Sequence, residues 1–262
     1  MIFRHIKLTW YWIVTVFYYY RQIFIEWAGD YIYHPRCRKL YSSQVINYQQ
    51  YKMSNIMRCR LSFTKKKYLV LDLDETLIHS KIFRVNQKVE IPDFKFTLND
   101  IYIVNESREK IIMKKIFNTV NVYKRPHVDH FLKTVSQWYD LVVYTASVEV
   151  YGCSVVRWLE NGYHLFKKCH YRKDCKWLDG TFVKDLTIIS KDLSNILIID
   201  NSPEAYIEYP NNGLPISTWT TGLRDVALLE LLPFLDALRF TNNVQSILSR
   251  INETTKSINK FN

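Results

Sequence analysis

Glycine and proline are scarce in this sequence of 262 residues. Six Gly and seven Pro exclude collagen-like chains and Gly/Pro-rich low-complexity chains. No self-similar unit of about 20–50 residues recurs, which argues against solenoids and propellers. Hydrophobic residues make up 48% of the chain and charged residues 23%, so it can bury a core and is not disordered as a whole.

Acidic residues are almost absent from the first quarter of the chain. Residues 1–67 carry 12 Lys/Arg against Glu26 and Asp30, a net charge of +10, whereas residues 68–262 carry 24 against 23, a net charge of +1. The basic character therefore belongs to the N-terminal quarter, and the remainder is a nearly neutral body. Phosphate-backbone binding needs a basic face on the binding domain itself, so we expect no nucleic-acid partner.

The five cysteines are odd in number and form no C-x-x-C pair. A disulfide framework is therefore not expected, and a reducing compartment such as the cytosol or nucleoplasm fits this chain. His164, Cys169, His170 and Cys175 lie close together in sequence, but their spacings match no zinc template. We interpret them as core thiols and surface imidazoles.

An uncharged run rich in Trp and Tyr lies near the N-terminus. Leu8–Tyr20 has 13 residues, and as a helix it would extend ~20 Å, short of the ~30 Å hydrocarbon core. No small-residue cleavage site of a signal peptide follows it. The run is enriched in aromatic residues, and ten Lys/Arg lie between Arg21 and Lys67 against two before the run. Both observations favour a membrane segment with the body on the cytosolic side; a buried first helix is the alternative. We expect residues 1–33 to anchor the chain, spanning or lying on the bilayer, and residues 34–67 to form a basic linker.

From Tyr68 onward, short apolar strands alternate with amphipathic helices. The expected strands are 68–74, 141–144 and 195–200, the expected helices are 128–138, 148–159, 225–238 and 244–251, and Asp179-Gly180 is expected to turn a hairpin within 176–184. This alternation predicts an α/β fold, a doubly wound Rossmann-like parallel sheet with right-handed crossovers and a short β-hairpin insertion. We place this domain at 68–250, before a polar tail at 251–262.

Polar side chains follow the three predicted strands. Asp72 and Asp74 end the first strand, Thr145 follows the second, and Asp200 and Asn201 follow the third. In open parallel sheets the ligand binds outside the carboxyl ends of the strands. The sequence therefore predicts that these residues converge on one crevice.

Two carboxylates in Asp72-x-Asp74-x-Thr76 repel each other unless a cation or a reaction uses them. One carboxylate can attack phosphorus to form an aspartyl-phosphate, and the other can protonate the leaving alkoxide and later deprotonate the attacking water. A phosphate trianion needs Mg²⁺ to approach two carboxylates. A strand-end Asp that caps a turn is the alternative.

Two further residues fit a phosphate site. The Thr145 hydroxyl can donate to a phosphate oxygen, although an N-cap of the next helix explains it equally well. Lys184 can neutralise charge on the phosphoryl group and hold Asp72, although a solvated strand lysine has the same spacing. Asp200 can in turn fix Lys184.

Five stretches of the chain resemble a known family: 68–80 (YLVLDLDETLIHS), 125–127 (RPH), 141–147 (LVVYTAS), 183–186 (VKDL) and 198–206 (IIDNSPEAY). They resemble the haloacid-dehalogenase superfamily and, within it, the FCP/SCP group of C-terminal-domain phosphatases. The likeness is greatest to the nuclear-envelope, Dullard-type branch of that group. It covers residues 68–250.

The resemblance implies roles for the candidate residues. Asp72 is then the nucleophile and Asp74 the general acid/base. Thr145 and Lys184 are the phosphate contacts. Arg172 falls where the family carries an arginine close to bound phosphopeptide.

The same resemblance implies a Mg²⁺ site. The metal would be held by the Asp72 carboxylate, the Asp74 main-chain carbonyl and Asn201. Thr76 and Asp200 would support these ligands.

By resemblance we expect a Mg²⁺-dependent phosphoserine/phosphothreonine protein phosphatase at the endoplasmic-reticulum or nuclear-envelope membrane, its catalytic domain facing cytosol or nucleoplasm. A lipin-type phosphatidate phosphatase is the implied substrate, and a small membrane-bound regulatory subunit the implied partner. The segment 93–125 is longer than the family's usual strand pair, which leaves substrate choice open. Two alternatives are a small-molecule phosphatase of the superfamily, disfavoured by the lack of a helical cap between Asp72 and Pro126, and a catalytically silent phosphopeptide-binding module, disfavoured by the intact aspartates.

Overall fold

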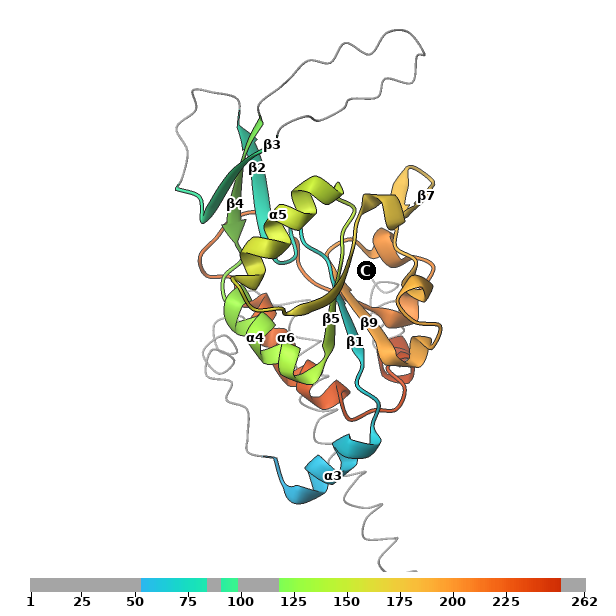
Figure 1. Ribbon diagram of the computed structural model, residues 1–262. Coiled ribbons are helices and arrows are strands. Elements are labelled where there is room, and N and C mark those ends of the chain that lie inside the picture. Colours follow the sequence, from blue (N-terminus) through green and yellow to red (C-terminus); the bar gives the residue numbers. More distant parts are fainter. Residues whose placement is uncertain (1–52, 84–90, 99–117, 251–262) are drawn as a thin grey trace, which may run out of the picture. The chain divides into compact units, whose positions relative to one another are not determined.

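The structure, a computed structural model, describes residues 53–83, 91–98 and 118–250. Its centre is a five-stranded sheet with the order β10-β9-β1-β5-β6, in which every neighbouring pair is parallel (Figure 1). The strands are β1 (Tyr68–Leu71), β5 (Asp140–Tyr144), β6 (Phe166–His170), β9 (Ile196–Asp200) and β10 (Gly213–Pro215). The predicted doubly wound α/β fold is confirmed.

The three central strands form the hydrophobic core together with helices. Every residue of β5 and β9 is buried, as is all of β1 after Tyr68, which is typical of parallel strands covered on both faces. The helices are α4 (Val128–Trp138), α5 (Glu149–Glu160) and α6 (Ala227–Leu238). Helix α4 buries an apolar stripe at helical spacing and packs on β5 and α6. This buried core fixes the positions of the carboxyl ends of β1, β5 and β9, which lie at one edge of the sheet.

A second, antiparallel sheet follows the first strand, with the order β2-β4-β3. Its strands are β2 (Ile78–Phe83), β3 (Phe94–Leu98) and β4 (Asn118–Lys124). The sheet packs on α5 through aromatic rings: Phe94 stacks on Trp158 with ring centroids 5.0 Å apart, and Phe96 lies 6.0 Å from the ring of Tyr151. The sequence predicted a long segment here but not these three strands.

The predicted hairpin is confirmed as β7 (Lys176–Leu178) and β8 (Thr181–Val183), which pair antiparallel. Asp179 and Gly180 between them have φ angles of 48° and 83°. Two successive positive φ angles are what a tight type I′ turn requires, so the Asp-Gly sequence is the reason for the turn. Strand β8 leads directly into Lys184.

The other predicted elements agree with the structure to within two residues at most boundaries. The first strand ends at Leu71, earlier than expected, because the chain turns into a loop at Asp72. Residues 245–250 are helical, as predicted for 244–251. The described part of the predicted linker, residues 53–67, contains the helix α3 (Asn55–Phe63).

The predicted anchor at residues 1–33 lies outside the described residues. Among the residues that are described, no helix has the length and apolar character needed to cross a bilayer.

Candidate active site

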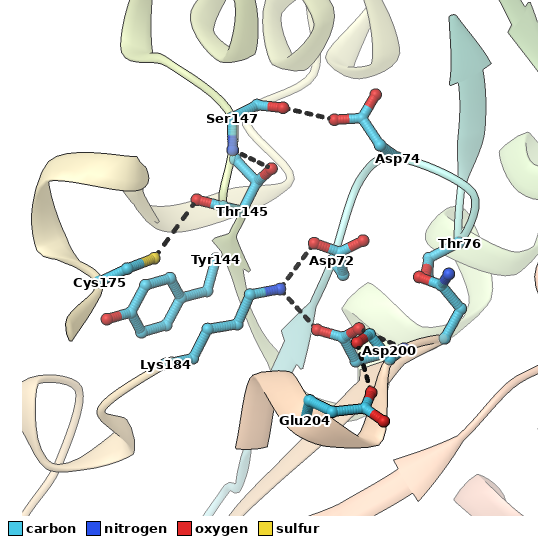
Figure 2. Close-up of polar contacts among 12 residues, drawn as sticks. Asp72, Asp74, Thr76, Tyr144, Thr145, Ser147, Cys175, Lys184, Asp200 and Glu204 are labelled. Carbon is cyan, nitrogen blue, oxygen red and sulfur yellow. Dashed lines mark hydrogen bonds and ion pairs between the residues drawn. The ribbon is translucent and has the colours of Figure 1, made fainter. Parts of the chain in front are cut away.

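Asp72 lies at the carboxyl end of β1, in the centre of the sheet. Its main-chain N–H donates to the carbonyl of Ile199 in the neighbouring strand at 3.1 Å, which continues the pairing of β1 with β9. Because this hydrogen bond fixes the backbone, the Asp72 carboxylate is directed from the sheet edge toward Lys184 (Figure 2).

Lys184 joins Asp72 to Asp200. Its Nζ lies 2.6 Å from Asp72 Oδ1 and 2.6 Å from Asp200 Oδ2, and the lysine side chain is only 1% exposed. Lys184 is 112 positions from Asp72 and 16 positions from Asp200 in sequence, and the ends of β1, β8 and β9 bring the three residues together. The prediction that Asp200 can fix Lys184 beside Asp72 thus agrees with the geometry, and the solvated strand lysine is excluded.

Burial and neighbouring charges shift the pKa values of both Asp72 and Lys184. Burial raises the pKa of Asp72 to about 7; Lys184 opposes the shift, and the neighbouring carboxylate of Asp200 adds to it. Burial by itself would lower the pKa of Lys184, but its two carboxylate partners outweigh it and raise that pKa above its ordinary value. The ammonium therefore stays charged, and the cluster has one cation between two acids.

Asp74 lies in the loop after β1 and points away from Lys184 (Figure 2). The next residue, Glu75, has a φ of 59°, in the left-handed region, which turns the chain sharply. The Asp74 carboxylate accepts a hydrogen bond from Ser147 Oγ at 2.6 Å and another from the hydroxyl of Tyr151 on α5. Asp74 is thus held by two hydroxyl groups rather than by a cation.

Thr145 follows β5 and is buried. Its Oγ1 accepts the main-chain N–H of Ser147 at 3.0 Å, so the hydroxyl proton is left to donate elsewhere. Helix α5 begins four residues after Thr145, at Glu149, and its N-cap residue is Val148. The N-cap explanation for Thr145 is therefore wrong, and the predicted phosphate contact stands as a prediction.

Asn201 lies beside the loop that carries Thr76. The Thr76 hydroxyl donates to Asn201 Oδ1 at 3.1 Å, and Asn201 Nδ2 donates to Thr218 Oγ1 at 3.2 Å. These two bonds hold the plane of the amide in one orientation. One lone pair of that oxygen remains available to a further ligand.

The donor set at this edge fits Mg²⁺. Asp72 Oδ1 is bonded to Lys184, which leaves Oδ2, and Asn201 offers an amide oxygen; Mg²⁺ prefers oxygen ligands of this kind and keeps several waters. No group of three or more His, Cys, Asp or Glu side chains in the described part of the chain is arranged to hold a metal, so a site here depends on the amide and on main-chain oxygen as well as on Asp72.

Arg172 lies at the rim of this edge and is exposed. Its main-chain N–H donates to the carbonyl of Ser147 at 3.0 Å, and its Nε donates to the carbonyl of Ala146 at 2.6 Å. The guanidinium lies 5.0 Å from the ring centroid of Phe182. The structure thus places Arg172 against the loop of Thr145 but does not bring it to the carboxylates.

Sequence reasoning missed the residues that support this site. Ser147 and Tyr151 hold Asp74, and Arg125 lies fully buried behind the loop, where it donates to the Thr76 carbonyl at 3.1 Å and forms a two-pronged pair with Asp225 at 2.8 and 2.9 Å. The only sequence signal for Arg125 was its place in the Arg-Pro-His stretch, and Tyr151 had none beyond its helix position.

The parallel sheet, the Asp-x-Asp-x-Thr loop after its first strand and the lysine between two aspartates define the fold and site of a haloacid-dehalogenase-like hydrolase. The sequence profile of the family described as "NLI interacting factor-like phosphatase" matches residues 67–245. The chain belongs to this family of phosphatases.

Several curated proteins are similar to this chain in sequence. The "CTD nuclear envelope phosphatase 1 homolog" of Drosophila melanogaster is 44% identical over 220 residues, covering 84% of this chain and 87% of the relative. The Caenorhabditis elegans protein of the same name is 46% identical over 208 residues, covering 79% and 81%. "Nuclear envelope morphology protein 1" of Saccharomyces cerevisiae is 37% identical over 205 residues, covering 72% and 43%. The solved structure of Fcp1, an essential RNA polymerase II CTD phosphatase, is 18% identical with a TM-score of 0.47, covering 71% of this chain and 53% of that one, which is too distant to add to the family match.

Proposed function

We propose that this chain is a Mg²⁺-dependent phosphoserine/phosphothreonine protein phosphatase that works through an aspartyl-phosphate. The observation that carries the proposal is Lys184, whose ammonium lies 2.6 Å from each of two acids at the end of the sheet. It holds the Asp72 carboxylate in one orientation while the second acid, Asp74, lies two residues away on different partners. One acid is thus fixed for attack on phosphorus, and the other is available for proton transfer.

Each residue contributes separately to this chemistry. Asp72 attacks the phosphorus, and Asp74 donates a proton to the leaving alkoxide and takes one from the water that hydrolyses the phosphoenzyme. Lys184 and the Thr145 hydroxyl stabilise the charge on the phosphoryl oxygens. Asp72, the Asp74 carbonyl and Asn201 would hold Mg²⁺, which when bound screens and orients the phosphate.

A protein substrate is favoured by the surroundings of the site. The described residues between β1 and α4 form only the strands β2, β3 and β4, without a helical cap over the carboxyl edge. Arg172 at the rim is exposed, as a contact to a phosphopeptide requires. The alternatives remain a small-molecule phosphatase and a silent phosphopeptide-binding module.

One assay separates these functions. The purified chain with Mg²⁺ is tested on an aryl phosphate, on a panel of phosphopeptides and on phosphosugars. We expect turnover of the aryl phosphate and of phosphoserine or phosphothreonine peptides. A preference for phosphosugars would favour the small-molecule enzyme, and peptide binding without turnover would favour the binding module.

The names of the relatives support a place at the nuclear envelope for this chain, and the endoplasmic-reticulum membrane is the second place that we propose. We extend the proposal to attachment through residues 1–33, to a lipin-type phosphatidate phosphatase as substrate and to a small membrane-bound regulatory subunit as partner. Deleting residues 1–33 should release a soluble and active enzyme, measured by flotation with vesicles of phosphatidylcholine alone and by aryl phosphate turnover. Aggregation of the truncated chain would instead indicate that the aromatic run is a core helix.

A further inference from the structure

Helix α3 differs from the other helices because it buries nothing. None of its nine residues is buried, whereas α4, α5 and α6 each bury an apolar stripe. Ile56 is 82% exposed and Phe63 is 84% exposed. Their spacing of seven residues places them on one face of the helix, with the exposed Cys59 between them. This face is an apolar stripe that lacks a partner in the described part of the chain.

The charge around the stripe is of one sign. The sequence has no Asp or Glu between Asp30 and Asp72, and α3 itself carries Arg58 and Arg60. Among the ion pairs of residues 53–83, 91–98 and 118–250, none involves either arginine. Unpaired cations beside an exposed apolar stripe are the chemistry of a helix that lies in the interface of an anionic membrane.

The connection between α3 and the sheet is short and fixed. Four residues, Thr64–Lys67, separate the helix from β1. Lys66 forms an ion pair of 3.1 Å with Asp140 at the start of β5, and Lys67 is buried and donates to the carbonyl of Arg239 at 2.9 Å. The end of α3 is therefore held near the amino edge of the sheet, opposite the edge that carries Asp72.

We infer that α3 docks on an anionic lipid surface, with Ile56, Cys59 and Phe63 in the interface, Arg60 of the same face on the headgroups, and Arg58 of the opposite face adding to the positive charge near them. The inference rests on the proposed membrane attachment but uses a segment separate from residues 1–33. Since β1 has four residues and a strand rises ~3.3 Å per residue, Asp72 lies ~13 Å along the strand from its start, at the edge of the sheet away from α3. Docking through α3 thus turns the active site away from the lipid and toward a soluble phosphoprotein.

The test uses the full-length chain with Cys37→Ser, labelled at Cys59 with an environment-sensitive fluorophore. Cys153, Cys169 and Cys175 are half-buried, so Cys59 reacts preferentially under native conditions. Vesicles are made of phosphatidylcholine alone or mixed with phosphatidylserine. We expect a blue shift of the Cys59 label only on the phosphatidylserine vesicles.

A matched control reports on the orientation of the body. Thr221 is exposed, and the preceding Trp219 is tied to the loop after β1 through the carbonyl of Glu75 at 2.9 Å. A label at Thr221→Cys, with Cys37 and Cys59 changed to Ser, should keep a water-like spectrum on both kinds of vesicle.

Charge variants test the cause of docking. Arg58→Gln with Arg60→Gln should lower the lipid-inserted fraction of the Cys59 label roughly 30-fold, at about one order of magnitude per one to two cations. Arg58→Lys with Arg60→Lys should retain insertion. Both pairs should hydrolyse an aryl phosphate at the unchanged rate, because neither residue lies near Asp72.

Three results would overturn the inference. A Cys59 label that stays water-like while the chain cosediments with anionic vesicles would show that residues upstream of α3 hold the membrane alone. An equal shift on both kinds of vesicle would contradict the role of charge. A shift of the Thr221 label together with that of Cys59 would contradict the orientation. Failure of the wild-type chain to hydrolyse the aryl phosphate would instead contradict the proposed function and leave docking untouched.

Discussion

The two halves of the active site each hold an aspartate, but they hold it with different kinds of partner. In the sheet-edge half, Asp72 is nearly buried and bonded to a buried ammonium that also holds Asp200. In the loop half, Asp74 is partly exposed and bonded to the hydroxyls of Ser147 and Tyr151. The two aspartates are two residues apart in sequence. Because Asp72 lies at the end of β1 and Asp74 lies in the loop that follows, their side chains point toward different partners (Figure 2).

The difference shows how one motif supplies two chemical roles. Burial raises the pKa of Asp72 to about 7, while the ion pair with Lys184 opposes this rise and holds the carboxylate in place, so Asp72 is suited to attack as the anion that Lys184 stabilises. Hydroxyl groups can donate or accept, so the partners of Asp74 serve both its protonated and its ionised form. The environment assigns a nucleophile to one half and a proton carrier to the other.

The largest effect is expected in the sheet-edge half. Asp72→Asn keeps the shape of the side chain and the Lys184–Asp200 pair, so the fold should be retained. Without a nucleophilic oxygen charge, turnover should fall on the order of 10⁴-fold or more. Aryl phosphate turnover and a thermal melt measure the two consequences, and residual activity above about a tenth of wild type would contradict the aspartyl-phosphate route.

The loop half should respond differently. Asp74→Asn should lower turnover of alkyl phosphates ~10²–10⁴-fold, because proton transfer is lost. An aryl phosphate whose phenolate leaves without a proton should recover much of the first step, and phosphoenzyme should then accumulate. Burst kinetics with the two substrate types provide the measurement. Equal losses on both would show that Asp74 is not the proton donor.

The contrast between buried and exposed ion pairs can be measured as stability. Lys184→Met leaves two buried acids without a cation and should cost about 3–5 kcal/mol of unfolding free energy. Lys176→Met is the matched control, since Lys176 pairs with Asp185 at 3.1 Å and Glu208 at 2.9 Å while half exposed, and its loss should change the free energy of unfolding far less. Denaturant unfolding of the two variants tests this, and similar losses would contradict the difference in burial.

The smallest expected effect concerns the metal. Asn201→Ala should raise the Mg²⁺ concentration for half-maximal activity about 10–100-fold and leave turnover at high Mg²⁺ largely intact. Asp74→Asn preserves the main-chain carbonyl, so its metal curve should be nearly unchanged. Mg²⁺ titrations of both variants provide the comparison. A shifted curve for Asp74→Asn with a normal curve for Asn201→Ala would show that the roles are assigned wrongly.

Most of the sheet was predictable because its strands are continuous apolar runs. The strands β1, β5 and β9 and the helix α4 each carry their own signal, in the run or in the helical spacing. The sheet β2-β4-β3 was not predicted, because its strands mix polar with apolar residues instead of forming apolar runs, and because its pairing joins Ile78 to Lys124, which are far apart in sequence. Pairing of that kind depends on loop closure and leaves little local pattern.

The site was predictable in its residue types but not in its supports. Asp72, Asp74 and Asp200 follow apolar strands, so topology alone brings them to one edge. Lys184 carries no such signal, and its place was implied by resemblance rather than by spacing. The hydroxyl of Tyr151 reaches Asp74 only because of the rotation of α5 about its axis, which packing against β3 sets and the sequence pattern does not.

The buried Arg125 has a consequence for the order of synthesis. It ties the loop after Asp74 to Asp225, and the two partners of that ion pair are 100 residues apart. A chain emerging from the ribosome can form β1 and place Asp72, but Arg125 finds its carboxylate only after residue 225 has left the exit tunnel. Contacts of such sequence separation form late in folding. The loop that carries Asp74 therefore gains its last support after Ser147, Tyr151 and Lys184 have emerged, and a chain that stops before residue 225 has these catalytic groups without the ion pair that braces their loop.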